Sequence, residues 1–392
     1  MFRKILIWIG AFAIAVVAGL AALGSITKSK APELSTSLPF SNGYAFEALS
    51  SGLVKTYLVE NDGRFPDKSA KSWRSLAVRA FEAEPITPAA IVVLALGEEG
   101  DVQRELMQHS ISLSRRQQLV HGWMVADGGS REDVVSILSS YDTMMRIKPS
   151  SGSVILPVVS KAVANDMFLE PLSEILEANP PWAIGFWQNV STTSESITNG
   201  AKLRRMLFKP DEDRSFYLDS NMIEGLVRER KYPEAFSYYE LLSATPEKNT
   251  NIIHNGDFSS LSQFPPLDWR LTTDGEYGAT IDDGMLNISA VSNSGGLFAR
   301  QLVRLPAAML KLNVQFNQIV PDGVQLYLQL TCAEEIDGRL QAIKIPLNRV
   351  SVSKTISNNE DYCKFYWLDI LGKSAQNEGF DIGLKLVSIR RN

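Results

Sequence analysis

The spacing of apolar residues changes near residue 250, and this change limits the possible folds more than any other feature. Before it, apolar side chains recur every three to four residues, as on the buried face of a helix. After it, apolar and polar residues alternate, as in half-buried strands. The sequence predicts an α-helical part and then a β-sheet part, joined at Asn251–Phe258.

The C-terminal part contains short alternating runs separated by glycines. In Leu310–Phe316 the apolar side chains take every second position, and Val324–Leu330 repeats the pattern. Short strands of this kind predict an antiparallel β-sandwich with mostly hairpin connections. The runs are Gly278–Ile281, Met285–Ser289, Phe298–Leu302, Leu310–Phe316, Val324–Leu330, Phe365–Ile370 and Ile382–Val387.

The N-terminal part contains amphipathic helical segments whose ends recur. Segments stop at Pro85, Pro149 and Pro246. The first interval between these prolines is close to two units of about 34 residues and the second to three, and one such unit is the length of a tetratricopeptide helix pair. A tetratricopeptide-like array is expected, with a generic α-helical array as the alternative. Aromatic residues at Trp182 and at Phe186-Trp187 interrupt it, and we interpret them as filling an irregular joint. The alternative is an exposed aromatic ledge for sugar or a partner helix.

The first residues predict a membrane anchor. Ile5–Gly24 is uncharged and, at about 1.5 Å per residue, long enough to cross a bilayer core of about 30 Å. An uncleaved anchor is expected, and cleavage as a signal peptide after Ala22-Leu-Gly24 is the alternative. The short basic tail before this segment predicts one span, with the bulk of the chain across the membrane in a periplasm-like space. A formal net charge of −5 gives no reason to expect nucleic acid as a partner.

Four regions follow from these patterns. Their expected limits are an anchor at 1–24, a linker at 25–42, the helical domain at 43–248 and the sandwich at 249–392.

The two cysteines, Cys332 and Cys363, both lie in the predicted sandwich. In an oxidising compartment a disulfide between them would close a loop of about 30 residues, and two buried thiols are the alternative. A zinc site is not expected, because no further Cys or His lies near them at ligand spacing.

Two resemblances rest on short motifs. The run Asn255-Gly-Asp-Phe258 followed by Leu267-Asp-Trp269 resembles the opening of galactose-binding-like jelly rolls of carbohydrate-binding modules. The chain from about residue 75 to 390 also resembles membrane-anchored tetratricopeptide proteins of alphaproteobacteria, some linked to exopolysaccharide synthesis and export. That second likeness rests on Glu84-Pro85, Leu113-Ser-Arg-Arg116, Tyr141-Asp142, Asn179-Pro-Pro-Trp182 and Asp268-Trp-Arg270. It implies an architecture and an envelope setting rather than a chemistry.

Catalytic motifs are absent from the sequence. His109, His121 and His254 form no metal-binding pair, and no nucleophile elbow, phosphate loop or dinucleotide fingerprint is present. We expect no catalytic residue, no metal and no cofactor. Adjacent carboxylates occur at Glu98-Glu99, Asp211-Glu-Asp213, Asp282-Asp283 and Glu334-Glu335, and a structural calcium near Asn255, Asp257 or Asp369 is a minor alternative.

Aromatic residues in the sandwich are the candidates for sugar binding, because a sugar ring has an apolar face that stacks on an aromatic ring. They are Trp269, Tyr277, Tyr327, Tyr366 and Trp367. Core packing is the competing role, above all for Trp269. Since Tyr366 and Trp367 are neighbours in one strand, one is expected to face inward and the other outward.

The leading hypothesis is a non-enzymatic envelope protein. Its helical array would bind a protein partner, its sandwich would dock on polysaccharide or on the array, and residues 5–24 would lie in the inner membrane. The alternatives are a carbohydrate-active enzyme whose carboxylates converge only in the fold, and a purely structural assembly factor.

Overall fold

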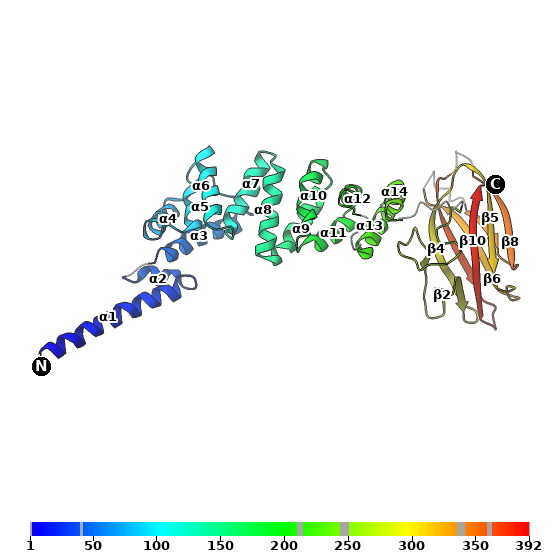
Figure 1. Cartoon of the computed structure of the whole chain (residues 1–392), viewed down its shortest axis with the longest axis horizontal. Helices are drawn as coiled ribbons and strands as arrows, with labels where there is room; N and C mark the ends of the chain where they lie inside the picture. Colours follow the sequence, from blue (N-terminus) through cyan, green and yellow to red (C-terminus); the bar gives the residue numbers. More distant parts are fainter. Residues whose placement is uncertain are drawn as a thin grey trace. The chain divides into compact units, whose positions relative to one another are not determined.

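The computed structural model describes residues 2–39, 42–209, 215–243, 251–334, 342–358 and 363–391. Helices occupy the first part of the chain and strands the last part (Figure 1), so the predicted fold class is confirmed. The predicted border at 248/249 lies outside the described residues.

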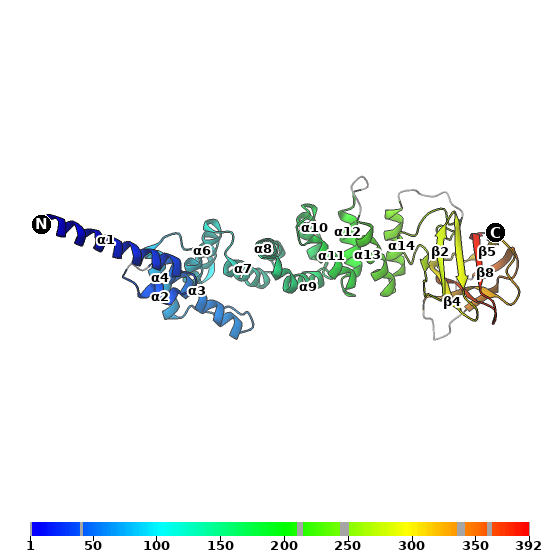
Figure 2. The ribbon, with the colours of Figure 1, turned by 90° about the horizontal axis from the view of Figure 1, so that it is seen from below.

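The helices end close to the predicted positions. Proline begins α5, where a missing N–H has no cost, and α8 ends just before Pro149. The helices, seen again from below in Figure 2, are α1 (Phe2–Thr27), α2 (Pro32–Ser37), α3 (Gly43–Glu60), α4 (Lys71–Ala83), α5 (Pro88–Ala95), α6 (Gly100–Leu113), α7 (Gln118–Ser130), α8 (Val134–Ile147), α9 (Gly152–Ala162), α10 (Leu169–Glu177), α11 (Ala183–Thr192), α12 (Ile197–Met206), α13 (Phe216–Arg228) and α14 (Tyr232–Leu242).

The chain forms two compact units. The first comprises Met1–Ile155 and Ala178–Trp182, and the second comprises Leu156–Glu177 and Ala183–Asn392. In the first unit α5 is apolar along its whole length and packs against α3, α4, α6 and α7. The Glu47 carboxylate accepts a hydrogen bond of 2.7 Å from the N–H of Ala89 at the start of α5. Burial raises the pKa of Glu47.

The N-terminal helix has the length of a membrane span. Within the described residues, Trp8–Thr27 is the one helical stretch long and apolar enough to cross a bilayer, by length and composition alone. The predicted linker at 25–42 is not structureless, because it contains α2. The Ser35 hydroxyl on α2 donates 2.9 Å to the carbonyl of Gly24.

In the second unit, helices α12 to α14 share a buried ionic group. The Asp219 carboxylate on α13 accepts 2.9 Å from Arg204 Nε on α12 and 2.7 Å from the Tyr238 hydroxyl on α14. Burial is the largest cause that raises the pKa of Tyr238, and the Asp219 charge adds to it. One buried carboxylate therefore joins three helices.

The C-terminal part of the second unit is an antiparallel β-sandwich of two five-stranded sheets. Sheet A has the order β1-β4-β9-β6-β7 and sheet B the order β2-β3-β10-β5-β8. The strands are β1 (Arg270–Leu271), β2 (Tyr277–Asp282), β3 (Met285–Ala290), β4 (Gly295–Arg304), β5 (Ala308–Phe316), β6 (Gln325–Cys332), β7 (Ala342–Pro346), β8 (Ser351–Asn358), β9 (Phe365–Lys373) and β10 (Phe380–Arg391).

The connections differ from the prediction. Among the described strands only β2–β3 and β6–β7 are consecutive partners, so the expectation of mostly hairpin links is wrong. From β3 onward the chain passes repeatedly between the sheets, in jelly-roll fashion. Inward alternation is confirmed: Leu310, Leu312, Val314 and Phe316 of β5 all lie in the core.

Candidate functional site

Trp269 lies in the sandwich core. Its side chain is 1% exposed, its indole N–H donates 3.1 Å to the carbonyl of Asn255, and its ring packs 5.8 Å from that of Phe258. A ring buried on both faces cannot stack on a sugar, so Trp269 is withdrawn as a binding residue.

Tyr366 and Trp367 point to opposite faces of β9, as the alternation predicts. Tyr366 is 4% exposed, and its hydroxyl donates 2.9 Å to the Asn358 side chain inside the core. Tyr366 is therefore also withdrawn. Trp367 is half-buried on the outward side of sheet A.

Tyr277 is half-buried at the other sheet. It lies on β2 of sheet B and packs edge-on against Phe298, with ring centres 5.5 Å apart. A shallow pocket beside it is lined by Glu276, Asn287 and Asp381, among others. Tyr277 therefore does not share a surface with Trp367.

The outer face of sheet A brings the two remaining aromatic candidates together. On β9, Trp367, Asp369 and Leu371 alternate with core-facing residues, and Gln325, Tyr327, Gln329 and Thr331 do the same on β6. The register pairs Trp367 with Thr331, Asp369 with Gln329, Leu371 with Tyr327 and Lys373 with Gln325. Tyr327 is half-buried, like Trp367. We call these outward residues, with Arg300 of β4 and Lys344 of β7, the sheet A outer face.

A cation lies over each aromatic ring of this face. The Arg300 guanidinium lies 5.0 Å from the centre of the Trp367 ring, and Lys344 Nζ lies 3.9 Å from that of Tyr327. Arg300 also donates 2.6 and 2.8 Å to the two oxygens of Asp369. These hydrogen bonds raise the pKa of Arg300, so the pair stays ionised and neutral overall.

Hydrogen-bonding groups lie between and beside the two rings. Gln329 donates 3.1 Å to the Thr331 hydroxyl, and the Tyr327 hydroxyl donates 3.2 Å to Gln325. Trp367 and Tyr327 are on adjacent strands and four residues apart in register, so their Cα atoms are about 14 Å apart. The face therefore presents two separated aromatic groups, with the Gln329 amide between them, the Thr331 hydroxyl opposite Trp367 and the Gln325 amide on the far side of Tyr327.

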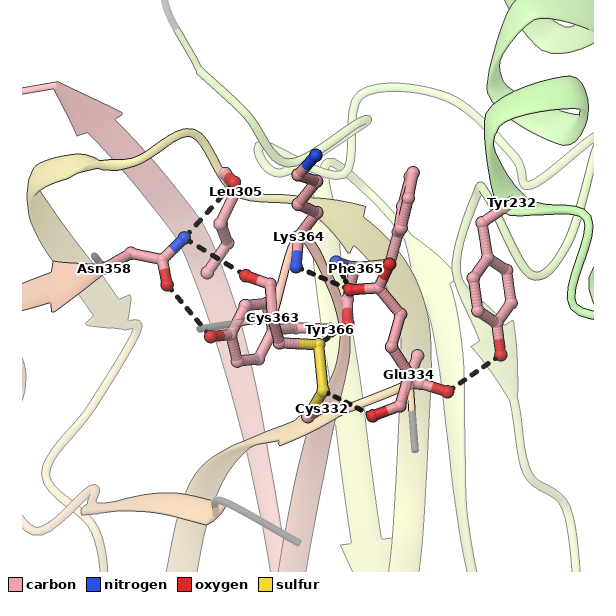
Figure 3. The surroundings of a disulfide bond; sticks show 10 residues. Tyr232, Leu305, Cys332, Glu334, Asn358, Cys363, Lys364, Phe365 and Tyr366 are labelled. Atoms are coloured by element: carbon pink, nitrogen blue, oxygen red, sulfur yellow. Dashed lines mark hydrogen bonds between the residues drawn. A yellow bond between two sulfur atoms is a disulfide. The ribbon is translucent and has the colours of Figure 1, made fainter. Parts of the chain in front are cut away.

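One end of the sheet A outer face is covered by α14. Tyr232 and Phe236 lie with ring centres 5.3 and 5.5 Å from that of Phe365 at the start of β9. The Tyr232 hydroxyl donates 3.0 Å to the carbonyl of Ala333, beside the disulfide (Figure 3). The open part of the face thus begins after Phe365, at Trp367.

The predicted disulfide is confirmed. Cys332 and Cys363 are bonded, with Cα atoms 5.7 Å apart, at neighbouring ends of β6 and β9 (Figure 3). The alternative of two buried thiols is wrong. The bridge lies within sheet A and fixes the ends of the strands that carry Tyr327 and Trp367.

The opening motif at residues 251–258 has a structural role. Asn251 accepts 2.9 Å from the N–H of Ile389, and the carbonyl of Gly256 accepts 2.7 Å from the N–H of Val387. Phe258, at 1% exposed, fills the core. The motif joins the start of the sandwich to its last strand and offers no surface to a ligand.

The three aromatic residues at the predicted joint of the helical part are buried. Trp182 donates 2.8 Å from its indole nitrogen to Asp142, and Phe186 and Trp187 are buried against each other with ring centres 5.0 Å apart. The alternative of an exposed aromatic ledge is therefore wrong, and the packing role is confirmed.

The adjacent carboxylates are engaged in local contacts. Glu98 pairs with Arg74 at 2.8 Å, Glu99 with Lys68 at 3.2 Å, and Glu334 accepts 2.7 Å from the N–H of Lys364. Asp282 accepts the N–H of Asp283 in the β2–β3 turn. Asp211-Glu-Asp213 and Glu335 lie outside the described residues.

The proposed calcium ligands do not form a site. Asp369 is bound by Arg300, while the side chains of Asn255 and Asp257 bond to Ser260 and Ser259 in their own loop. Of the described residues, only Cys332, Glu334 and Cys363 bring three metal-ligating side chains together, and the disulfide consumes both sulfurs.

Most residues of the sheet A outer face were not predicted from the sequence. Arg300, Gln329 and Lys344 were not singled out, and Asp369 was considered only for calcium. The usable signal was the alternation itself, because outward positions of β6 and β9 are fixed once Leu328 and Leu368 are assigned to the core.

Comparisons with known proteins found solved structures that are similar to the sandwich. No protein-family model matches the chain, and no curated protein matches it. Three solved structures cover 36% of this chain and 99% of their own: a family 61 carbohydrate-binding module in complex with beta-1,4-galactotriose (15% identity, TM-score 0.25), a family 4 module (14%, 0.24) and a family 16 module (14%, 0.24). At these TM-scores the likenesses carry no inference about a ligand.

Proposed function

We propose that the sandwich binds an oligosaccharide or polysaccharide along the sheet A outer face. The observation that carries this proposal is the placement of Trp367 and Tyr327, both half-buried, on one open face with amide and hydroxyl groups between and beside them. Aromatic faces stack on the apolar side of a sugar ring, while amides and hydroxyls bond its hydroxyl edge.

The spacing of the two rings indicates the length of the ligand. A separation of about 14 Å exceeds the width of one sugar ring, so a single sugar cannot reach both. An oligosaccharide lying along the strands contacts both rings and the polar groups between them. Monosaccharides are expected to bind far more weakly than chains.

The chemistry of the face favours binding over hydrolysis. Glycoside hydrolysis requires two carboxyl groups about 5–9 Å apart across the scissile bond. Asp369 is the one carboxylate among the outer-face residues defined above, and Arg300 holds both of its oxygens. These contacts support a non-enzymatic role.

We propose an envelope setting for this binding. We propose that α1 anchors the protein in an inner membrane, with the bulk in the periplasm, and that the helical domain holds a protein partner. Stacked helices expose extended surfaces suited to partner segments. A role in exopolysaccharide assembly or export would use all three properties: membrane anchoring, partner binding and polysaccharide binding.

Binding is tested with purified full chain in detergent, titrated calorimetrically against a panel of soluble polysaccharides. Trp367→Ala and Tyr327→Ala are each expected to weaken binding at least ten-fold, since stacking on either ring is lost. Asn313→Ala on the outer side of β5 in sheet B is the matched control, because it removes a polar side chain from the other sheet. Unchanged binding by both aromatic variants would contradict the proposal.

A further inference from the structure

The charges of the sheet A outer face are not balanced. With Lys373 of β9 included, the outer-face residues named above comprise three cations, Arg300, Lys344 and Lys373, and one anion, Asp369. Arg270 of β1 and Arg304 of β4 lie on the same side and pair with Glu224 and Glu240. Arg300 and Asp369 neutralise each other at 2.6 Å. Among the residues that the structure describes, neither Lys344 nor Lys373 has an acidic partner within salt-bridge distance. The face is positive although the chain as a whole has a net charge of −5.

Both lysines flank the same aromatic ring. Tyr327 on β6 lies between β7 and β9 in the sheet. Lys344 pairs with Gln329 on one side, and Lys373 pairs with Gln325 on the other. Each lysine is thus a diagonal neighbour of Tyr327 on the same face, at about 7–8 Å, within reach of a long side chain. Lys344 already places its ammonium over the ring, 3.9 Å from the ring centre, so a sugar that stacks on this side of Tyr327 displaces the ammonium toward the edge of the ring.

An aromatic ring with a cation on each side suits a sugar that carries negative charge. The ring of a uronic acid has an apolar C–H face for stacking and a carboxylate on its edge. Stacked on Tyr327, it brings the carboxylate toward Lys344 or Lys373, while the Arg300–Asp369 pair beside Trp367 adds no net charge. Both lysine side chains are exposed, so their ammonium groups stay hydrated until a ligand binds.

We propose that the ligand of this face is an acidic polysaccharide, with Lys344 and Lys373 pairing with its carboxylates on either side of Tyr327. The inference rests on the proposed function and narrows it to a chemical class. The competing explanation is that Lys344 only prevents the edge strand β7 from pairing with a strand of another chain.

The test uses the full chain in detergent and pairs of polymers that differ only in charge. Polygalacturonate and alginate are each compared with their methyl esters, in which the backbone is kept and the carboxylates are neutral. At least one acid form is expected to bind ten-fold or more tightly than its ester, and the difference is expected to shrink as salt rises. The double variant Lys344→Gln/Lys373→Gln should lower acid binding about ten-fold and leave ester binding unchanged.

A charge-matched control separates the site from bulk electrostatics. Lys311→Gln/Lys354→Gln removes two exposed lysines from sheet B and should leave binding as it is. An equal loss in this control would overturn the inference. So would esters that bind as tightly as acids while Trp367→Ala weakens both, an outcome that leaves the proposed function standing. If neither form binds and Trp367→Ala changes nothing on the wider panel, both proposals fail.

Discussion

At the residue scale, single polar groups fix the packing of the second unit. The Asp219 carboxylate is 2% exposed and takes donors from α12 and α14, so its charge is stable only while both donors are present. Gly256 also fixes packing, in the sandwich, because a Cβ at this position would collide with the carbonyl oxygen of Val387. Both positions are structural, and neither requires a ligand.

The buried tyrosine beside Asp219 predicts a loss of stability in alkali. The folded pKa of Tyr238 is raised above its ordinary value of 10.0, so the contribution is complete below about pH 10 and is lost as pH rises above it. Tyr238→Phe should cost about 1.5–3 kcal/mol at neutral pH, since a hydrogen bond to a charged group is lost. It should also flatten the alkaline decline, which urea unfolding at several pH values measures. Parallel slopes for both proteins above pH 10 would contradict this.

Gly256→Ala tests the joint between the opening motif and β10. The new methyl group has no room, because hydrogen bonds to Val387 hold Gly256 in place. The substitution should lower the free energy of unfolding by about 1–3 kcal/mol. Gly129→Ala in α7 is the control, since a Cβ there meets nothing, and it should be neutral or stabilising by up to about 1 kcal/mol. Equal effects would refute the explanation.

At the element scale, strand alternation was predictable and strand order was not. Runs such as Leu310–Phe316 show directly which side chains face inward, because side-chain direction in a strand repeats every two residues. Three strands at sheet edges were missed, because β8 is polar and β1 and β7 are short. Which strands pair depends on long-range contacts, so the crossings between sheets are invisible in local patterns. The helix-ending prolines Pro85 and Pro149 act locally, and their effect was foreseen.

The same contrast applies to the site. Residues Trp269 and Tyr366 read as aromatic candidates, but only the fold shows that both fill the core. Arg300 and Asp369 are 69 residues apart, and their ion pair exists only because β4 and β9 are neighbours. A pair of such distant residues leaves no signal in the sequence.

The disulfide is expected to stabilise the sheet that carries the proposed site. Its cysteines are separated by 31 residues, and closing a loop of that size in the unfolded chain is worth about 3–4 kcal/mol. Cys332→Ala/Cys363→Ala should unfold at correspondingly lower urea concentration. Dithiothreitol should shift the parent protein to the same midpoint and leave the variant where it is. A parent protein indifferent to reductant under unfolding conditions would show that the bridge adds no stability.

At the scale of the whole molecule, the N-terminal helix is the feature that bears on where the protein is located. Trp8–Thr27 has a mean hydropathy of 2.3, and its apolar side chains are exposed, as a span without a bilayer would be. The helix itself is confirmed, while anchoring remains a prediction. A cleaved signal sequence is the alternative that fits the same composition.

Fractionation of bacteria that express the chain with an N-terminal tag tests anchoring. The tagged chain should stay with membranes after carbonate washing. Ile14→Arg/Val17→Arg should release it or prevent its export, because each arginine near the middle of a span costs about 2.5–3.5 kcal/mol. Leu34→Arg, just outside the span, should have no such effect. Soluble protein that has lost the tag would indicate cleavage instead.

The last strand, β10, is the central member of sheet B, with β3 on one side and β5 on the other. It also donates backbone hydrogen bonds to Asn251 and Gly256, among the first residues of the sandwich. A nascent chain on the ribosome therefore has no native sheet B until the 12 residues of β10 have left the exit tunnel. A premature stop codon ahead of β10 would not trim this domain but would leave its two halves without the strand that joins them.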